Sequence, residues 1–253
     1  MIAEEDRAQL MADLPDDGTG NWLNAVARLG WQITPHCPGQ EFEIKYAPVT
    51  REIGHTQLGH YVRQVKNAEL PADLVMPDWL SFRTMVSEYW LVDGVEWSLQ
   101  RLSSGERLKR KVHTVYTDRL GRPPLIQSRE TFMSAPEQVA SVVGGLANSI
   151  GTLQKRQAKA FLVKLDAGVV FNLTESRCTS AAAEQIQLEL EYSCHLHRGT
   201  GAPASPCRPV DIRELLWEVD GRLAALLRAA NLTPTTELKQ DFVRAQSESS
   251  RYR

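Results

Sequence analysis

Two stretches of alternating polar and apolar residues, far apart in the chain, constrain the fold of this 253-residue sequence most strongly. The first reads Glu41-Phe-Glu-Ile-Lys45, and the second reads Gln185-Ile-Gln-Leu-Glu-Leu-Glu-Tyr192. Alternation with a period of two residues is typical of a β-strand with one polar and one apolar face. Each stretch therefore predicts a strand that presents two carboxylates on the same side of a sheet.

The carboxylates of these two strands form a candidate metal site. Glu41 and Glu43 share one face of the first strand. Glu189 and Glu191 share one face of the second, so together the strands can offer four hard oxygen ligands to a divalent cation. Lys45 continues the first face and could meet a phosphate near that metal. A lone Glu-x-Glu strand is more often a solvated sheet face, but two copies at the start and end of a strand-rich region favour the metal site.

The chain between these two strands is rich in further predicted strands. The Asp93-Gly94 pair separates two of them, 82–92 and 95–102, and has the composition of a tight hairpin turn. Other strands are predicted at 107–116, 125–133, 157–165 and 169–177. Strands joined by short reversals pair antiparallel, and a sheet whose polar faces point inward most simply closes into a barrel. We therefore expect roughly seven or eight strands in a largely antiparallel barrel.

Helical patterns flank the strand region. Apolar residues recur at helical spacing in the segments 2–14, 20–30, 54–70 and 211–231. The segment 136–151, interrupted by the Gly144-Gly145 pair, indicates a loop or a loosely formed helix. We expect a single domain at residues 1–232 and a polar, flexible C-terminal tail at residues 233–253.

Composition limits the classes of protein that the chain can belong to. The formal net charge is −2, so any site for a polyanion must be a local concentration of Lys and Arg. No apolar run reaches the roughly 18 to 20 residues of a membrane span, and the acidic start Ala3-Glu-Glu-Asp6 is unlike a signal peptide. The four cysteines lack Cys-x-x-Cys spacing. With no secretory signal, we expect reduced thiols in the cytosol or nucleus.

Several predicted strands also present basic residues on one face, so a barrel that contains the four glutamates would have acid on one wall and base on the others. The candidate phosphate-binding residues are Lys45, Arg101, Lys109, Lys111, Arg129, Lys155 and Lys159. The direction of Arg101 is open, because the opposite face of its strand, with Glu96 and Ser98, gives a more polar lining. Burying a charge costs several kcal/mol per ion, so interior charge on this scale favours a functional reason.

These residues resemble a known family. The Glu-x-Glu-x-Lys of residues 41–45 and the Glu-x-Glu of residues 189–191 resemble the hallmark of the triphosphate tunnel metalloenzymes. Within that family, the chain most resembles the metal-dependent RNA 5′-triphosphatases of mRNA capping in fungi, protozoa and some viruses, with a length similar to the trypanosomatid members. The segments 129–137, 155–161 and 170–174 are similar to further strands of the fungal enzymes. The departures are Gln157, Val170 and Asn172, which stand where the fungal pattern has a base, an arginine and an acid.

The resemblance implies a fold, a reaction and partners. The fold is α+β, a closed antiparallel eight-stranded β-barrel with flanking helices, and its tunnel strands span about residues 40–195. The reaction is removal of the γ-phosphate from 5′-triphosphate RNA, and from free NTPs, with Mg²⁺ or Mn²⁺ as the cofactor. The residues that would carry it are Glu41, Glu43, Lys45, Arg129, Glu189 and Glu191, of which the four glutamates hold the metal. A capping role further implies a nuclear location and a separate guanylyltransferase that acts next.

Three alternatives remain open at this point. The first is another tunnel triphosphatase that acts on inorganic triphosphate or thiamine triphosphate and shares every metal ligand. The second is a non-catalytic barrel that binds RNA or polyphosphate; the intact glutamate pairs argue against it, because phosphate binding alone needs bases. The third is a β-rich domain whose glutamate faces are simply solvated.

Overall fold

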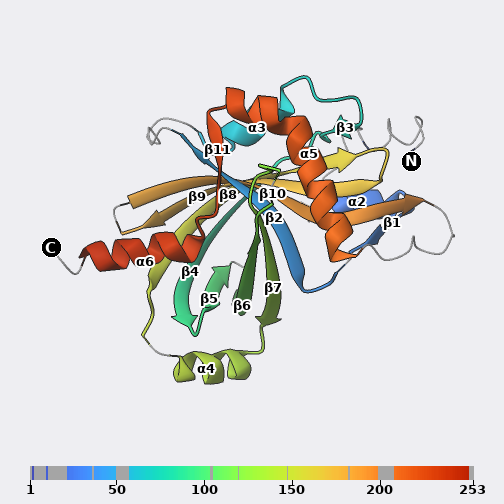
Figure 1. Cartoon of the computed structure of the whole chain (residues 1–253). Helices are drawn as coiled ribbons and strands as arrows, with labels where there is room; N and C mark the ends of the chain where they lie inside the picture. Colours follow the sequence, from blue (N-terminus) through green and yellow to red (C-terminus); the bar gives the residue numbers. More distant parts are fainter. Residues whose placement is uncertain are drawn as a thin grey trace.

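The computed structural model describes residues 22–35, 37–49, 57–102, 105–118, 120–146, 148–181, 183–198 and 208–250, together with residues 2 and 10 (Figure 1). Its strands are β1 (Trp31–Thr34), β2 (Gln40–Pro48), β3 (Leu74–Val75), β4 (Ser81–Val92), β5 (Val95–Leu102), β6 (Gly105–Tyr116), β7 (Leu125–Met133), β8 (Gly151–Lys164), β9 (Val169–Ser180), β10 (Ala183–Arg198) and β11 (Leu232–Thr235). Its helices are α2 (Trp22–Arg28), α3 (His60–Lys66), α4 (Pro136–Gly145), α5 (Pro209–Ala229) and α6 (Lys239–Ser250).

The strands form a closed barrel. They follow the order β10-β9-β8-β4-β5-β6-β7-β2, and β2 pairs back with β10. Every one of these pairings is antiparallel. The predicted closed eight-stranded antiparallel barrel is therefore confirmed. Three short strands outside this closed order, β1, β3 and β11, pair with β10, β8 and β2, respectively.

The hairpin between β4 and β5 shows how local sequence sets the register. Val92 pairs with Val95, which leaves Asp93 and Gly94 as the two turn residues. Both have positive φ, 51° and 76°, as a tight hairpin turn of the primed type requires. The turn fixes which residues of β5 face inward, and it agrees with the Asp-Gly prediction.

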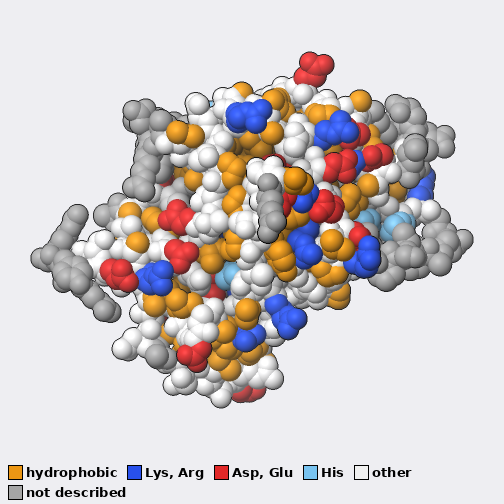
Figure 2. All heavy atoms as spheres, in the orientation of Figure 1, with side chains coloured by type: hydrophobic (Ala, Val, Ile, Leu, Met, Phe, Trp, Pro, Cys, Tyr) orange, Lys and Arg blue, Asp and Glu red, His pale blue; other side chains and the backbone are white. Residues whose placement is uncertain are grey.

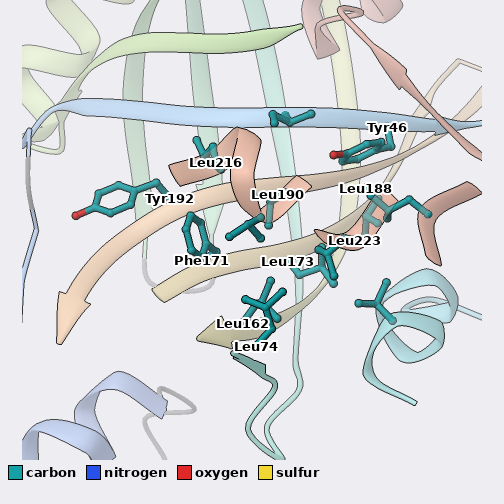
Figure 3. Close-up of a cluster of buried hydrophobic side chains, with 14 of the residues drawn as sticks. Tyr46, Leu74, Leu162, Phe171, Leu173, Leu188, Leu190, Tyr192, Leu216 and Leu223 are labelled. Atoms are coloured by element: carbon teal, nitrogen blue, oxygen red, sulfur yellow. The ribbon is translucent and has the colours of Figure 1, made fainter. Parts of the chain in front are cut away.

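The main apolar core lies outside the barrel. Phe42, Ile44 and Tyr46 of β2 are buried, and α5 crosses over their outer side. In Figure 3, Leu216 and Leu223 of this helix point toward the leucines of β10. Because the alternating strands place their apolar residues against α5, their polar residues face the barrel interior. The packing of α5 on β2 and β10 therefore determines which side chains of these strands line the barrel interior.

The predicted helices have different outcomes. The helix predicted at 211–231 is confirmed as α5, which begins with Pro209 in its first turn. The segment predicted as a loop or loose helix forms α4, which ends at the Gly144-Gly145 pair. The helix predicted at 2–14 lies almost entirely outside the described residues, as does the first part of the one predicted at 54–70. None of the helices in the described part of the chain combines the length and apolarity of a membrane span.

The prediction of a flexible tail from residue 233 onward is wrong for the described residues of that segment. β11 pairs with β2, and α6 packs against β4, β8 and β9, with Val243 fully buried (Figure 1). The helix approaches β8 so closely that a Cβ atom on Gly151 would lie 2.8 Å from the Val243 side chain. The segment is polar overall, so its sequence did not indicate that two apolar residues, Phe242 and Val243, pack it against the barrel.

Candidate active site

A cavity of about 680 Å³ occupies the barrel interior. This volume falls in the range of small-molecule binding sites, but the lining is dominated by charged and polar side chains. The cavity-lining acids include Glu41, Glu189 and Glu191. The cavity-lining bases include Lys109, Lys111, Lys155, Lys159 and Lys239.

The four predicted glutamates come together on adjacent strands. Glu43 of β2 lies directly opposite Glu191 of β10, and Lys45 lies opposite Glu189 in the same ladder. Glu43 and Glu189 are 2% and 5% exposed, so neither carboxylate has much contact with solvent. The period-two alternation of β2 and β10 thus places the acidic faces side by side within the barrel wall.

Lys45 lies between two of these carboxylates. Its Nζ atom is 3.0 Å from Glu189 Oε1, to which it donates a hydrogen bond, and 3.1 Å from Glu43 Oε1. Burial alone would lower the pKa of Lys45, but the two glutamates outweigh burial and raise it. Lys45 is therefore a fixed positive charge in the acidic wall.

A second ion-pair cluster joins β2, β6 and β7. Lys111 Nζ lies 2.6 Å from Glu41 Oε2 and 2.8 Å from Glu130 Oε1. Lys109 contacts Glu130 and lies 3.7 Å from Glu41. Burial would raise the pKa of Glu41, but Lys111 and Lys109 lower it well below its usual range. Both lysines therefore lie in the cavity, on the face that the alternation of residues 107–116 predicts.

Glu191 differs from the other acids because no lysine neutralises it closely. Burial, followed by repulsion from Glu41, raises the pKa of Glu191 to about 8, and Lys159 offsets only part of the shift. Burial and repulsion from Glu41 also raise the pKa of Glu43, against the attraction of Lys45. Two carboxyl groups directly opposite each other in a ladder repel when both are ionised, so full ionisation of this pair is unfavourable without a compensating positive charge.

The acidic wall fits a divalent cation. Glu43 Oε1 is buried and accepts no hydrogen bond, although Lys45 lies near it. Carboxylate oxygens are the ligands that Mg²⁺ and Mn²⁺ prefer, and a cation beside Glu43 and Glu191 would relieve their repulsion. Glu41 and Glu189 are the other two acids of the wall, each already engaged by lysines.

The described residues contain a tighter acidic group elsewhere, at Asp73, Asp166 and Glu218. Lys164 occupies its centre, with Nζ 2.6 Å from Asp166 Oδ2 and 3.0 Å from Glu218 Oε1. The lysine already supplies the positive charge, so this group is an ion-pair cluster on the outside of the barrel.

Lys155 and Lys159 of β8 also line the cavity, two strands away from β10 in the barrel. Burial lowers the pKa of Lys155 to about 7, and repulsion from Lys239 adds to the shift. Burial also lowers the pKa of Lys159, against the attraction of Glu191. Burial without a close acid makes these two lysines the part of the lining that an anionic ligand would stabilise most.

Sequence reasoning missed Lys239. Its ammonium group extends from α6 into the cavity and donates a hydrogen bond to Glu189. Burial would raise the pKa of Glu189, but Lys239 and Lys45 lower it well below its usual range. No pattern in the sequence connects a helical lysine with a strand glutamate 50 residues away.

Glu130 was also missed, and Arg129 was assigned to the wrong face of its strand. Arg129 is exposed and lines a separate outer pocket of about 300 Å³ with Gln40 and Arg110. Its neighbour Glu130 faces the interior instead. Figure 2 shows Lys and Arg side chains (blue) on the outer surface over this side of the barrel. Arg129 is therefore not part of the cavity lining.

Arg101 also lies outside the cavity. Its guanidinium is about half exposed, with Nε 2.9 Å from Glu106 Oε1. The opposite face of β5 supplies the lining through Glu96, Ser98 and Gln100. Arg101 is thus not brought into the cavity lining, and the polar alternative for this strand is the observed one.

No family model and no curated protein matches the sequence. Similar solved structures include the PH1012 protein from Pyrococcus horikoshii OT3, with 16% identity, a TM-score of 0.43, and coverage of 79% of this chain and 98% of that chain. The PH1819 protein from the same organism has 12% identity and a TM-score of 0.44, over 81% of this chain and 99% of that chain. The Pct1 RNA triphosphatase from S. pombe has 14% identity and a TM-score of 0.36, over 85% of this chain and 84% of that chain.

These likenesses are distant. The barrel is closed and eight-stranded, and its two Glu-x-Glu strands are adjacent and face inward. The closed eight-stranded antiparallel barrel, with both Glu-x-Glu strands facing its interior, is thereby confirmed.

Proposed function

We propose that this chain is a metal-dependent triphosphatase that removes the γ-phosphate of triphosphate-ended RNA and also hydrolyses free NTPs. The observation that carries the proposal is the division of one cavity into an acidic wall on β2 and β10 and basic groups on β6 and β8. A cation-bound polyphosphate is the ligand that needs both signs of charge in one place.

Glu43 and Glu191 would hold the cation, with Glu41 and Glu189 beside them. The chemistry that Mg²⁺ or Mn²⁺ supplies when bound is Lewis-acid polarisation of the γ-phosphoryl group. Lys45 remains next to these acids, where its positive charge is available to a phosphoryl oxygen. A carboxylate of the same wall would orient the attacking water.

The basic wall would bind and orient the remaining phosphates. Among the described residues neither Lys155 nor Lys159 forms an ion pair with an acid, so a phosphate oxygen would be a close anionic partner for each. Lys109 and Lys111 are held in place by Glu41 and Glu130 before substrate arrives. Fixed charges of this kind stabilise a transition state with little reorganisation.

The proposal extends to mRNA capping. Loss of the γ-phosphate leaves a diphosphate end, which is the substrate of a capping guanylyltransferase. We therefore propose that a separate guanylyltransferase acts on the product, and that the reaction takes place in the nucleus. Another tunnel triphosphatase, acting on inorganic triphosphate or thiamine triphosphate, would use the same acidic wall.

Phosphate release tests the proposal. The chain is incubated with γ-labelled triphosphate RNA and Mg²⁺ or Mn²⁺, and the rates are compared with those for ATP, inorganic triphosphate and thiamine triphosphate. We expect metal-dependent release that leaves a diphosphate RNA end. Much faster cleavage of inorganic or thiamine triphosphate would favour the other tunnel triphosphatases. Near-normal turnover by both Glu43→Ala and Glu189→Ala would contradict the metal assignment.

A further inference from the structure

Two exposed phenylalanines border an otherwise charged cavity. Phe82 is 57% exposed and Phe132 is 48% exposed, and both line the barrel cavity. The other large apolar side chains that are exposed in the described parts of the chain, such as Val115 and Leu120, do not line it. Exposed apolar side chains at a binding cavity indicate contact with a ligand.

Phe132 is surrounded by cations. The guanidinium carbon of Arg107 lies 4.9 Å from the centre of its ring, and Lys109 Nζ lies 5.4 Å from the same point. Arg107 is held in turn by Gln100, because its Nε atom donates a 2.7 Å hydrogen bond to Gln100 Oε1. The ring therefore belongs to an ordered aromatic and cationic group at the end of β7.

Phe82 lies at the start of β4, next to Arg83, which also lines the cavity. Arg83 and Arg107 both line the cavity, and burial, followed by repulsion from Arg83, lowers the pKa of Arg107. The rim thus combines two aromatic rings with two guanidinium groups. Planar arginine and phenylalanine side chains are the groups on which nucleobases stack.

Lys109 connects this rim with the acidic interior. The same ammonium group that lies over Phe132 is 3.7 Å from Glu41 Oε2. A ligand with a planar ring on Phe132 can therefore extend a polyphosphate chain directly toward the lysines and glutamates. Inorganic triphosphate has no group that would contact the rings.

We propose that Phe82 and Phe132 form a stacking site for the first nucleobase of a nucleoside triphosphate or a triphosphate-ended RNA. The proposal rests on the proposed function only in that the triphosphate occupies the barrel interior. Purines should bind more tightly than pyrimidines, because their larger rings cover more of the aromatic surface. The site selects nucleotides over other triphosphates.

The test is equilibrium binding without turnover. ATP and inorganic triphosphate are titrated by calorimetry, in EDTA, into the parent chain and into Phe132→Leu and Phe82→Leu. Leucine keeps the apolar volume but removes the aromatic face. We expect roughly tenfold weaker ATP binding in each variant, in line with the cost of losing one base–aromatic stack, and unchanged binding of inorganic triphosphate. Val115→Ala, which changes an exposed side chain outside the cavity, is the matched control and should bind both ligands normally.

The outcomes separate this proposal from the proposed function. Equal weakening of both ligands, no weakening of ATP, or failure of ATP to bind the parent chain would overturn the stacking site. Selective loss of ATP binding in a chain that hydrolyses no triphosphate would support the stacking site and contradict the hydrolase. Hydrolysis of ATP by the parent chain, with unchanged ATP binding in both variants, would support the hydrolase and contradict the stacking site.

Discussion

Glu43 and Glu191 lie directly opposite each other in the β2–β10 ladder, and both belong to the acidic wall of the barrel interior. Like charges in this position destabilise a sheet, and burial makes the repulsion worse. Burial, together with the charge of Glu41, raises the pKa of both groups, so each carboxylate is costly to ionise where it stands. We propose that a cation held by the two groups, rather than a gain in stability, accounts for this pair.

The first prediction concerns the metal. Glu191→Gln keeps the shape of the side chain but removes a ligand, so Mn²⁺ should no longer stabilise the variant against heat. A ligand present at about 100 times its Kd stabilises a folded protein by roughly 2.7 kcal/mol, which gives a clear rise in Tm for the parent chain. Thermal unfolding with and without MnCl2 measures the difference.

Two comparisons complete the metal experiment. Glu137→Gln, on the first turn of α4, should show the same Mn²⁺-dependent rise in Tm as the parent. Without metal, Glu191→Gln should be at least as stable as the parent, because it removes a repelling carboxyl group. If Mn²⁺ raises the Tm of Glu191→Gln as much as that of the parent, the acidic wall does not hold the ion in the way proposed.

The second prediction distinguishes the two faces of the β6–β7 hairpin. Lys111→Met should lower kcat/KM for ATP by a factor of about 100 or more, since loss of one preorganised charged donor typically has that effect. Arg129→Met should leave it within about twofold, because Arg129 lies on the outer face. Steady-state phosphate release, with Tm measured on both variants, checks the pair. Equal loss in both variants would show that the inner and outer faces have been confused.

Period-two alternation predicted the inward residues wherever one face was clearly apolar. On β2 and β10 the apolar residues pack under α5, so the glutamates could only face inward. On β7 the rule failed because Leu125 and Ile126 are both buried and an aromatic residue, Phe132, shares the inward face with Glu130. With no clear apolar face, the sequence favoured Arg129 through its likeness to a family motif.

Lys239 could not be predicted for a different reason. Its position depends on how α6 docks against β8 and β9, and that docking uses few apolar residues in a polar segment. Local composition therefore indicated a tail. The close approach of Val243 to Gly151 is a tertiary contact that no single-sequence pattern encodes.

The third prediction is that Lys239 holds α6 onto the barrel. Lys239→Met removes one of the two cations that neutralise buried Glu189, so the variant should lose about 3 kcal/mol of unfolding free energy. Lys239→Arg should retain most of the stability because it keeps the ion pair. Urea denaturation measures both, with Arg244→Met on the same helix as the control. A Lys239→Met chain as stable as the parent would show that Glu189 does not need this partner.

The last prediction concerns pH and Lys155. An unfolded lysine titrates near pH ~10.4, whereas burial and Lys239 lower the pKa of folded Lys155 to about 7. Between these values the unfolded chain holds a proton that the folded chain lacks, so the contribution of this group to stability rises with pH across that window. Below about pH 7 both states are protonated and the full cost of the buried charge remains.

Lys155→Met removes this cost. The variant should therefore be more stable than the parent at pH 6, by an amount on the order of a few kcal/mol, and the difference should shrink steadily toward pH 10. Urea denaturation at pH 6, 8 and 10 measures the trend. Arg156→Met changes the neighbouring, half-exposed side chain on the outer face and should show no such trend. A stability difference that is constant or grows with pH would mean that Lys155 is charged in the folded chain at neutral and alkaline pH. In that case, groups of the barrel itself would already stabilise the positive charge of Lys155, which we assign to phosphate binding.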